Sequence, residues 1–237
     1  MNPNITPIRR TLNGSGRPRL VVVKATVFYT SSVNTVYAAD SVTETGGDFS
    51  TILTGMRVFC PVNPPSFGKI TEIDTSNPAA PVLRIDGWNN GTPANGSAFV
   101  IDGYVVDLPR CQVLTEELDP YVVVHKLYRG RRKASLYGWN YTCVLDYSGL
   151  LTADALNDLL QPLNPGPDDR LILIPRADAP HYQYNAYWDG GYRLALRSLG
   201  HGYKNAVLKL RSTELVNYPR PLTGYGAGYG QNYGNQL

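Results

Sequence analysis

The feature that most constrains the fold is a long alternating stretch from Ala134 to Tyr147. A period of two is the period of a β-strand, in which successive side chains point to opposite faces. One of the two faces is nearly all aromatic and apolar, and consists of Ser135, Tyr137, Trp139, Tyr141, Cys143, Leu145 and Tyr147. We therefore expect a long strand whose aromatic face meets a hydrophobic core.

Two further elements follow this strand. A leucine-rich segment at residues 152–163 predicts one short helix, because its leucines fall on one stripe and Pro162 limits its length. The continuously apolar run Leu171–Pro175 predicts a buried central strand. The stretch from Tyr137 to Pro175 is thus expected to form strand, helix and strand.

The first half of the chain consists of short apolar stretches separated by turns rich in Pro, Asn and Gly. Turn signals at such close spacing favour a small antiparallel barrel or sandwich over alternating strands and helices. Within an otherwise polar loop at residues 31–50 we expect one short strand. The predicted strands are Leu20–Tyr29, Thr35–Ala38, Arg57–Cys60, Gly68–Asp74, Val82–Asp86 and Ala98–Leu108.

The predicted fold is mainly β. It has two antiparallel β-sandwich or barrel-like domains, the second with one short flanking α-helix, and extended N- and C-terminal arms. The domain boundary is expected at Thr115–Pro120, where the composition becomes acidic and a proline follows. We therefore predict an extended basic arm (1–19), a first β domain (20–115), a second β domain (116–218) and a Gly/Tyr-rich tail (219–237).

The composition indicates a lightly charged, tyrosine-rich surface. Only 17% of residues are charged, and 17 tyrosines stand against five phenylalanines. Tyrosine suits surfaces that are buried against other proteins, and it also fills strand positions, so both interpretations stay open. A net charge of +3 predicts no general preference for nucleic acid or acidic substrates.

Cations and tyrosines outside the predicted strands are the candidate assembly residues. The cationic segment Arg129–Lys133 follows a further predicted strand, Tyr121–Tyr128, and precedes the strand that starts at Ala134. It is either a hairpin tip or sheet edge protected by charge from stray pairing or a contact for phosphate or an acidic partner. The Gly/Tyr tail is low-complexity sequence that does not fold alone. The candidates are Arg9, Arg10, Arg17 and Arg19 in the arm, Arg129, Arg131, Arg132 and Lys133 between the strands, and Tyr225, Tyr229 and Tyr233 in the tail.

No catalytic constellation accompanies these residues in the sequence. His181 could pair with Asp178 but has no recognisable nucleophile, and Asp168-Asp169 is more typical of a solvated turn than of a metal pair. We expect no enzyme, no cofactor and no metal site. No signal peptide and no apolar run of about 18 residues is found. Three widely spaced cysteines predict buried thiols rather than disulfides or a zinc site: Cys60, Cys111 and Cys143.

Residues 126–216 resemble virion structural proteins of tailed bacteriophages, in particular distal-tail and tail-tube-like components. The resemblance rests on the strand Gly138–Tyr147, the leucine-rich segment, the strand and corner Leu171–Asp178, and the closing Leu208–Val216. It implies a β-sandwich flanked by a helix, assembled as a hexameric or trimeric ring around a channel, with extended arms lacing subunits together. Such proteins have no catalytic residues.

The resemblance leads us to expect a structural subunit of the tail tip or baseplate, the tail tube or the neck. Its partners would be copies of itself and other virion proteins, without membrane contact or direct nucleic-acid binding, and its location the virion, assembled in the host cytoplasm. The alternative is a carbohydrate- or receptor-binding β module, in which Trp88, Trp139 and Trp188 would stack on sugars.

Overall fold

The computed structural model describes residues 8–13, 18–62, 64–111, 113–126, 132–147, 161, 166–175, 183–189 and 207–216, with the backbone alone at 8–13 and 132–133. This part of the chain contains fourteen β-strands and no α-helix. The predicted helix at 152–163 lies, except for Gln161, outside the described residues.

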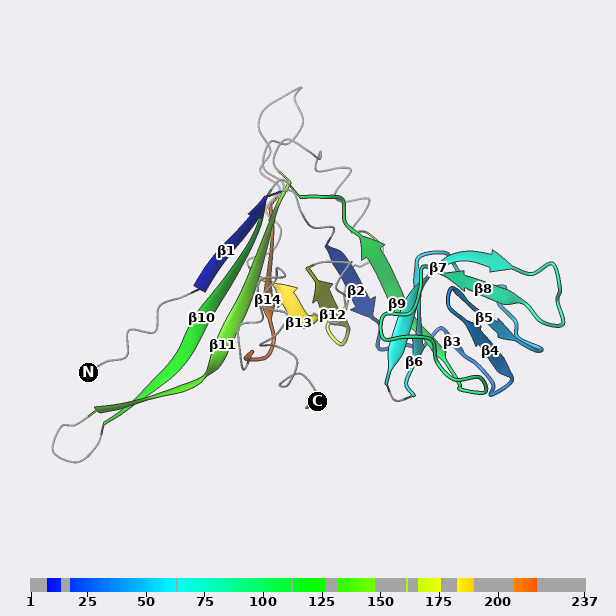
Figure 1. Cartoon of the computed structure of the whole chain (residues 1–237), viewed down its shortest axis with the longest axis horizontal. Helices are drawn as coiled ribbons and strands as arrows, with labels where there is room; N and C mark the ends of the chain where they lie inside the picture. Colours follow the sequence, from blue (N-terminus) through cyan, green and yellow to red (C-terminus); the bar gives the residue numbers. More distant parts are fainter. Residues whose placement is uncertain are drawn as a thin grey trace, which may run out of the picture.

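All strand pairings in the described part are antiparallel, which confirms the predicted mainly β fold (Figure 1). Thirteen strands follow one another across a single sheet, and β3 (Tyr29–Thr30) pairs with β9 beside this path. The order is β1 (Ile8–Asn13), β10 (Val113–Lys126), β11 (Arg132–Asp146), β14 (Val207–Ser212), β13 (Tyr184–Trp188), β12 (Arg170–Ile174), β2 (Arg19–Val23), β9 (Val100–Asp107), β6 (Met56–Cys60), β7 (Ser66–Asp74), β8 (Val82–Ile85), β5 (Ser41–Glu44) and β4 (Thr35–Ala38).

The six strands from β9 to β4 curl into a barrel-like unit, because the last strand returns to the segment that precedes the first. The backbone carbonyl of Thr35 accepts a hydrogen bond from the Gly96 N–H at 2.9 Å, and the Tyr37 N–H donates to Asn95 Oδ1 at 2.7 Å. These bonds cover the edge that β4 would otherwise expose. The interior is filled by Tyr37, Val42, Phe49, Ile52, Met56, Val58, Cys60, Ile70, Leu83, Ile85, Phe99 and Ile101.

A second core lies on the other part of the sheet and centres on β11. Trp139, Tyr141, Cys143, Leu145 and Tyr147 are all buried, as the alternating sequence predicts. The core also takes up side chains of β2, β10, β12, β13 and β14. The alternation of β11 therefore decides which face of this part of the sheet is buried.

Strand β2 joins the two parts, since it pairs with β9 on one side and with β12 on the other. Leu20 and Val22 belong to the second core, whereas Val21 and Val23 pack in a third cluster with Val105, Ile172, Ile174 and Phe67. Burial on both faces explains why β2 and β12 are continuously apolar rather than alternating. The buried position that the sequence predicts for Leu171–Pro175 is confirmed.

Several boundaries differ from the sequence prediction. The proline at the expected domain boundary, Thr115–Pro120, does not interrupt the strand, because β10 runs through this stretch from Val113 to Lys126. In this stretch β10 pairs with β11 residue by residue, and Pro120 lies opposite Trp139. The loop expected at residues 31–50 contains the additional strand β5, and the strand expected at Leu20–Tyr29 ends at Val23.

The basic arm expected at residues 1–19 is partly built into the sheet. Its residues Ile8–Asn13 form β1 and pair with Val113–Leu118 of β10, and Arg19 opens β2. The division of the chain into two folding units stays a prediction. The three cysteines are buried free thiols, as expected.

Candidate assembly interface

The long hairpin of β10 and β11 extends beyond the sheet to which it belongs (Figure 1). The neighbouring strand β1 pairs only with Val113–Leu118, and β14 pairs only with Thr142–Asp146. Residues 119–126 and 132–138, here called the ribbon, are thus paired with each other but with no other described strand. At both edges of the ribbon, the backbone N–H and C=O groups that point outward form no hydrogen bonds with another described strand.

A bulge separates the ribbon from the rest of the hairpin. The register shifts between Tyr121 and Val122, because Tyr137 is an extra residue on the β11 side. Gly138 follows it with φ of 154°, a backbone conformation that residues with a side chain rarely adopt. The bulge changes which face the β11 side chains of the ribbon occupy, so that Leu136 and Ala134 share the face of Trp139, while β10 alternates without interruption.

The ribbon exposes large apolar side chains on both faces. Tyr121, Val124, Leu136 and Tyr137 are 47%, 51%, 45% and 54% exposed. The rings of Tyr121 and Tyr137 meet edge to face, with centroids 6.2 Å apart, and the Tyr137 hydroxyl lies 3.5 Å from His125 Nε2. A two-stranded ribbon with this much exposed apolar surface is a marginal structure in water by itself.

The stretch from Lys126 to Lys133 is the most cationic part of the chain. Residues 120–145 contain five Lys and Arg and no Asp or Glu. The described part of the hairpin ends at the antiparallel pair of Lys126 with Arg132. Arg129 and Arg131 lie outside the described residues, and only the backbone is described for Arg132 and Lys133.

The remaining predicted assembly residues are scattered. Arg9 and Arg10 lie in β1, opposite Glu117 and Glu116 in the register with β10. Arg19 lies in β2, far along the sheet from them. Besides Arg129 and Arg131, four more predicted residues lie outside the described residues: Arg17, Tyr225, Tyr229 and Tyr233.

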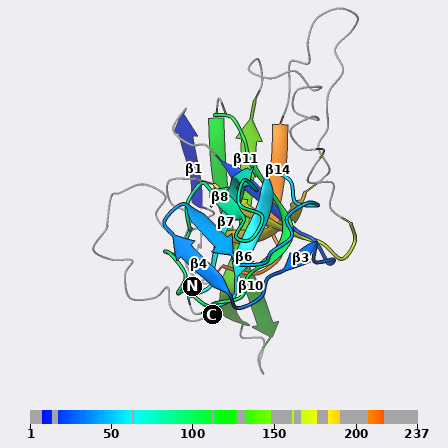
Figure 2. The same ribbon diagram turned by 90° about the vertical axis from the view of Figure 1, so that its right-hand side faces the viewer.

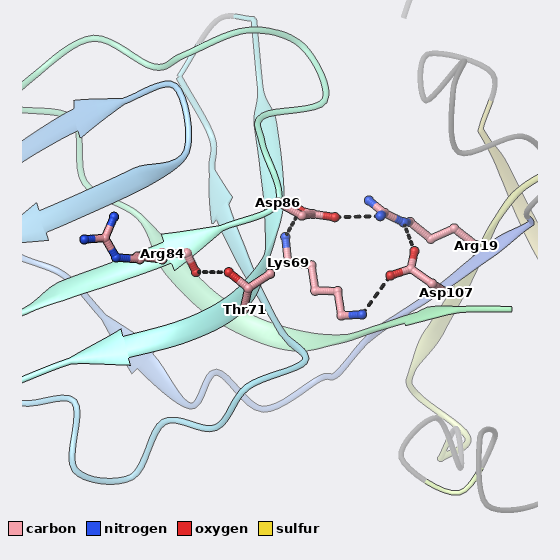
Figure 3. A network of polar contacts seen from close by, with 6 residues as sticks. All are labelled: Arg19, Lys69, Thr71, Arg84, Asp86 and Asp107. Carbon is pink, nitrogen blue, oxygen red and sulfur yellow. Dashed lines mark hydrogen bonds and ion pairs between the residues drawn. The ribbon is translucent and has the colours of Figure 1, made fainter.

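Arg19 is engaged inside the chain (Figure 3). Its Nε donates to Asp107 Oδ1 at 2.6 Å and its Nη2 to Asp86 Oδ2 at 2.6 Å. Lys69 completes the cluster, because its Nζ donates to Asp107 Oδ2 at 2.7 Å and its backbone N–H to Asp86 Oδ1 at 2.8 Å. The cluster ties β2 to the barrel-like unit.

The charges of this cluster support one another. Burial disfavours the charge on Arg19, but the carboxylates of Asp86 and Asp107 outweigh it and raise the arginine's pKa. Burial likewise disfavours the charged Asp107, and hydrogen bonds and charge from Lys69 and Arg19 outweigh it, so that the pKa of Asp107 is lowered. The cluster thus has a structural role at the junction between the two parts of the sheet.

Of the His and Asp residues singled out in the sequence, the structure describes Asp168 and Asp169. Asp169 accepts hydrogen bonds from Lys24 Nζ at 2.7 Å and from the Ala25 N–H at 3.0 Å, so it anchors a turn. His181 lies outside the described residues. Among the residues that were described, no group of three His, Cys, Asp or Glu side chains could hold a metal ion. The described part also contains no helix of the length and apolarity needed to cross a membrane.

The tryptophans of the sugar-binding alternative are poorly placed for stacking. Trp139 is only 9% exposed and belongs to the second core. The Trp88 Nε1–H donates to the Ala38 carbonyl at 2.9 Å, and its ring packs against Tyr37 with centroids 5.4 Å apart. Trp188 packs against the second core. These positions do not identify a tryptophan ring on which a sugar would stack.

Sequence reasoning missed the apolar surface of the ribbon. It placed Tyr137 on the buried face, whereas the bulge leaves this side chain 54% exposed. The observed strand lengths account for this surface: β10 and β11 have 14 and 15 residues, and no other described strand has more than nine. Strands of such unequal length must extend beyond their neighbours.

Comparison with protein-family models, with curated proteins and with solved structures gives no match to this chain.

Proposed function

We propose that this chain is a non-enzymatic structural subunit that assembles with copies of itself into a ring. The observation that carries the proposal is the ribbon, whose apolar side chains are exposed on both faces and whose edges have no described strand beside them. Exposed apolar surface and open edges on a soluble protein are typical of surfaces that other chains cover. A contact between different surfaces of two copies closes into a ring when its rotation allows.

The placement of this ring in a tailed-phage particle rests on the resemblance of residues 126–216. Tail tip or baseplate, tail tube and neck are the proposed positions, and other virion proteins the further partners. The ring is proposed to be hexameric or trimeric. The Gly/Tyr tail, with Tyr225, Tyr229 and Tyr233, is proposed to lace neighbouring subunits together.

The assembly proposal is tested with the purified full-length chain. We expect a discrete oligomer in sedimentation velocity and rings or stacked tubes in negative-stain electron micrographs. A chain that stays monomeric across the accessible concentration range contradicts the proposal. Removal of residues 222–237 should weaken assembly while the body stays folded, and unchanged assembly would overturn the role given to the tail.

Removal of residues 1–18 does not test the arm alone, because it also deletes β1 and exposes the edge of β10 at Val113–Leu118. The phage assignment has its own measurement. Mass spectrometry of purified particles of the virus that encodes the chain should detect it in a copy number divisible by three or six. Its absence from washed particles would contradict the virion location.

A further inference from the structure

The two faces of the ribbon differ in chemistry. Val122 is opposite Leu136 and Val124 is opposite Ala134, so these four side chains share one face. The other face carries Tyr121, Val123, His125 and Tyr137. The first face is aliphatic from Val122 to Val124 and ends at the register pair Lys126 and Arg132, and it continues the side of the sheet on which the second core lies. A surface that covers the ribbon must therefore offer apolar side chains for the aliphatic face and carboxylates that can pair with the Lys and Arg residues.

A second ribbon does not meet this requirement. Over residues 119–138 each copy carries five Lys and Arg against one acidic residue, Asp119, so two ribbons side by side would bring an excess of like charges together. The partner surface must instead have an excess of carboxylates. This condition points to another region of the same chain.

The region 20–115 has this excess: it contains five Lys and Arg against eight Asp and Glu, a formal net charge of −3. Four of these eight carboxylates already form ion pairs, namely those of Asp86, Asp102, Asp107 and Glu72. The pair of Glu72 with Arg84 is exposed, and Asp40 and Asp48 also lie at the surface of the barrel-like unit.

The outer face of β4, β5, β8 and β7, here called the barrel face, combines carboxylates with an apolar surface. The register aligns Val36, Thr43, Val82 and Asp74 in one row across the four strands, and Ala38, Ser41, Arg84 and Glu72 in the next. Val36 is 58% exposed, and Asp40 lies in the turn between β4 and β5. Most of these side chains are short, which leaves room for the larger residues of a ribbon.

The ribbon and the barrel face lie at opposite ends of the long axis of the molecule (Figure 1). The view in Figure 2 turns the barrel-like unit toward the reader, with β4 in front of β11 and β14. A ribbon therefore cannot reach the barrel face of its own chain. A contact between these surfaces joins two copies head to tail, the type of contact that forms a ring or a filament.

We propose that the ribbon of one copy packs on the barrel face of the next copy, with its aliphatic face around Val36 and its cations near Glu72, Asp74 and Asp40. This inference rests on the proposed function, since it names the two surfaces that hold neighbouring subunits together. It assigns the ribbon a single occupant, a second copy of the chain.

Two variants and a control test this contact. The ribbon variant carries Val124→Asp and Leu136→Asp, and the face variant carries Val36→Lys and Asp74→Lys. The control is Leu53→Asp, which changes a side chain that is 59% exposed and belongs to neither surface. All three act on exposed or half-exposed positions, so circular dichroism and thermal midpoints should stay close to those of the wild type.

Sedimentation velocity should show that each double variant alone loses assembly by roughly tenfold or more in affinity, while the control assembles like the wild type. An equimolar mixture of the two double variants should form a one-to-one dimer and nothing larger. In that mixture, one intact ribbon can meet one intact barrel face, and the remaining two surfaces are both disabled.

The outcomes separate the two proposals. If the wild type assembles and the ribbon variant assembles equally well, the contact is wrong but the assembly function stands. If the wild type stays monomeric, both fail. If both variants dissociate but their mixture forms no dimer, the contact is not between ribbon and barrel face. If the ribbon variant keeps assembly but loses retention of a single-stranded oligonucleotide, nucleic acid is the occupant.

Discussion

Arg57 and Asp102 form a buried ion pair between β6 and β9, at the register shift that separates Arg57 from Val58. One guanidinium nitrogen, Nη1, donates to Oδ1 at 2.9 Å and to Oδ2 at 2.8 Å of the carboxylate. The guanidinium also lies over two rings, 4.3 Å from the centroid of Phe59 and 5.0 Å from that of Phe67. Burial lowers the pKa of Arg57 and raises the pKa of Asp102. The opposite charge and the hydrogen bonds of the partner residue offset part of each shift.

Removal of one member of this pair should be strongly destabilising. Asp102→Ala leaves a buried cation without its counter-charge, which typically costs about 3–5 kcal/mol. The double variant Arg57→Met with Asp102→Ala should recover much of the loss, because no uncompensated charge remains. Urea unfolding of the wild type, both single variants and the double variant measures the coupling. Additive losses would show that the two side chains do not interact.

Gly103 should not tolerate any side chain. A Cβ at this position would lie 1.8 Å from the carbonyl oxygen of Val22, so β9 and β2 would have to separate. Gly103→Ala should therefore destabilise the protein by about 2–3 kcal/mol or more. The control Gly91→Ala meets open space at φ of 92° and should cost only about 1 kcal/mol. Thermal unfolding that ranks the two variants in the opposite order would contradict the close approach.

Asp169 should give the protein a specific sensitivity to acid. The hydrogen bond from Lys24, with others from the backbone N–H groups of Gly166 and Ala25, lowers its pKa from 3.8 to about 2. Its stabilisation is therefore fully present above pH 3.8 and is lost as the pH falls toward about 2. Asp169→Asn should be less stable than the wild type at neutral pH, and the two stability curves should converge in acid.

The adjacent exposed residue supplies the control for this measurement. Asp168→Asn should leave the difference between neutral and acidic stability nearly unchanged, since Asp169 keeps its contacts with Lys24 and Ala25. Chemical denaturation across the acid range tests both variants. Parallel curves for Asp169→Asn and the wild type would rule out the proposed linkage.

The cluster around Arg19 should contribute a modest, salt-dependent stabilisation. Asp107→Asn removes an acceptor of two charged contacts, from Arg19 and Lys69, whose side chains are 16% and 25% exposed. The expected loss is about 1 kcal/mol at low salt and less at high salt. Glu72→Gln breaks an exposed pair with Arg84 at 3.6 Å and should have almost no effect. Equal losses for the two variants would contradict a special role for the cluster.

The strands that the sequence predicts well are those with a strong local signal. Thr35–Ala38 is found with the same bounds as β4, and the strands predicted near Arg57, Gly68, Val82 and Ala98 differ from the observed ones by one or two residues at their ends. Alternation and turn residues are properties of neighbours in the chain, so they can be recognised without the fold.

The sequence predicted the cations of the candidate interface but not its exposed apolar side chains. The cations at Arg129–Lys133 are recognisable by composition, and their place at the end of a hairpin follows from the strands on either side. The exposed apolar side chains were not predicted, because exposure of Val124 and Leu136 depends on where β1 and β14 end. Strands β1 and β14 are far from this hairpin in the sequence, so no local pattern in β10 or β11 shows where β1 and β14 end.

The sequence by itself determined that the chain is a β protein, that its cysteines are buried thiols and that every second residue from Trp139 to Tyr147 faces a core. Only the tertiary structure decided that β2 links both parts of one sheet, and that β1 returns to pair with β10 across roughly a hundred residues of chain. The physical reason is that side-chain periodicity is local, whereas the choice of a strand's neighbours depends on backbone hydrogen bonds and packing between distant segments. The same long-range pairing leaves the ribbon uncovered and thereby creates the surface from which we infer assembly.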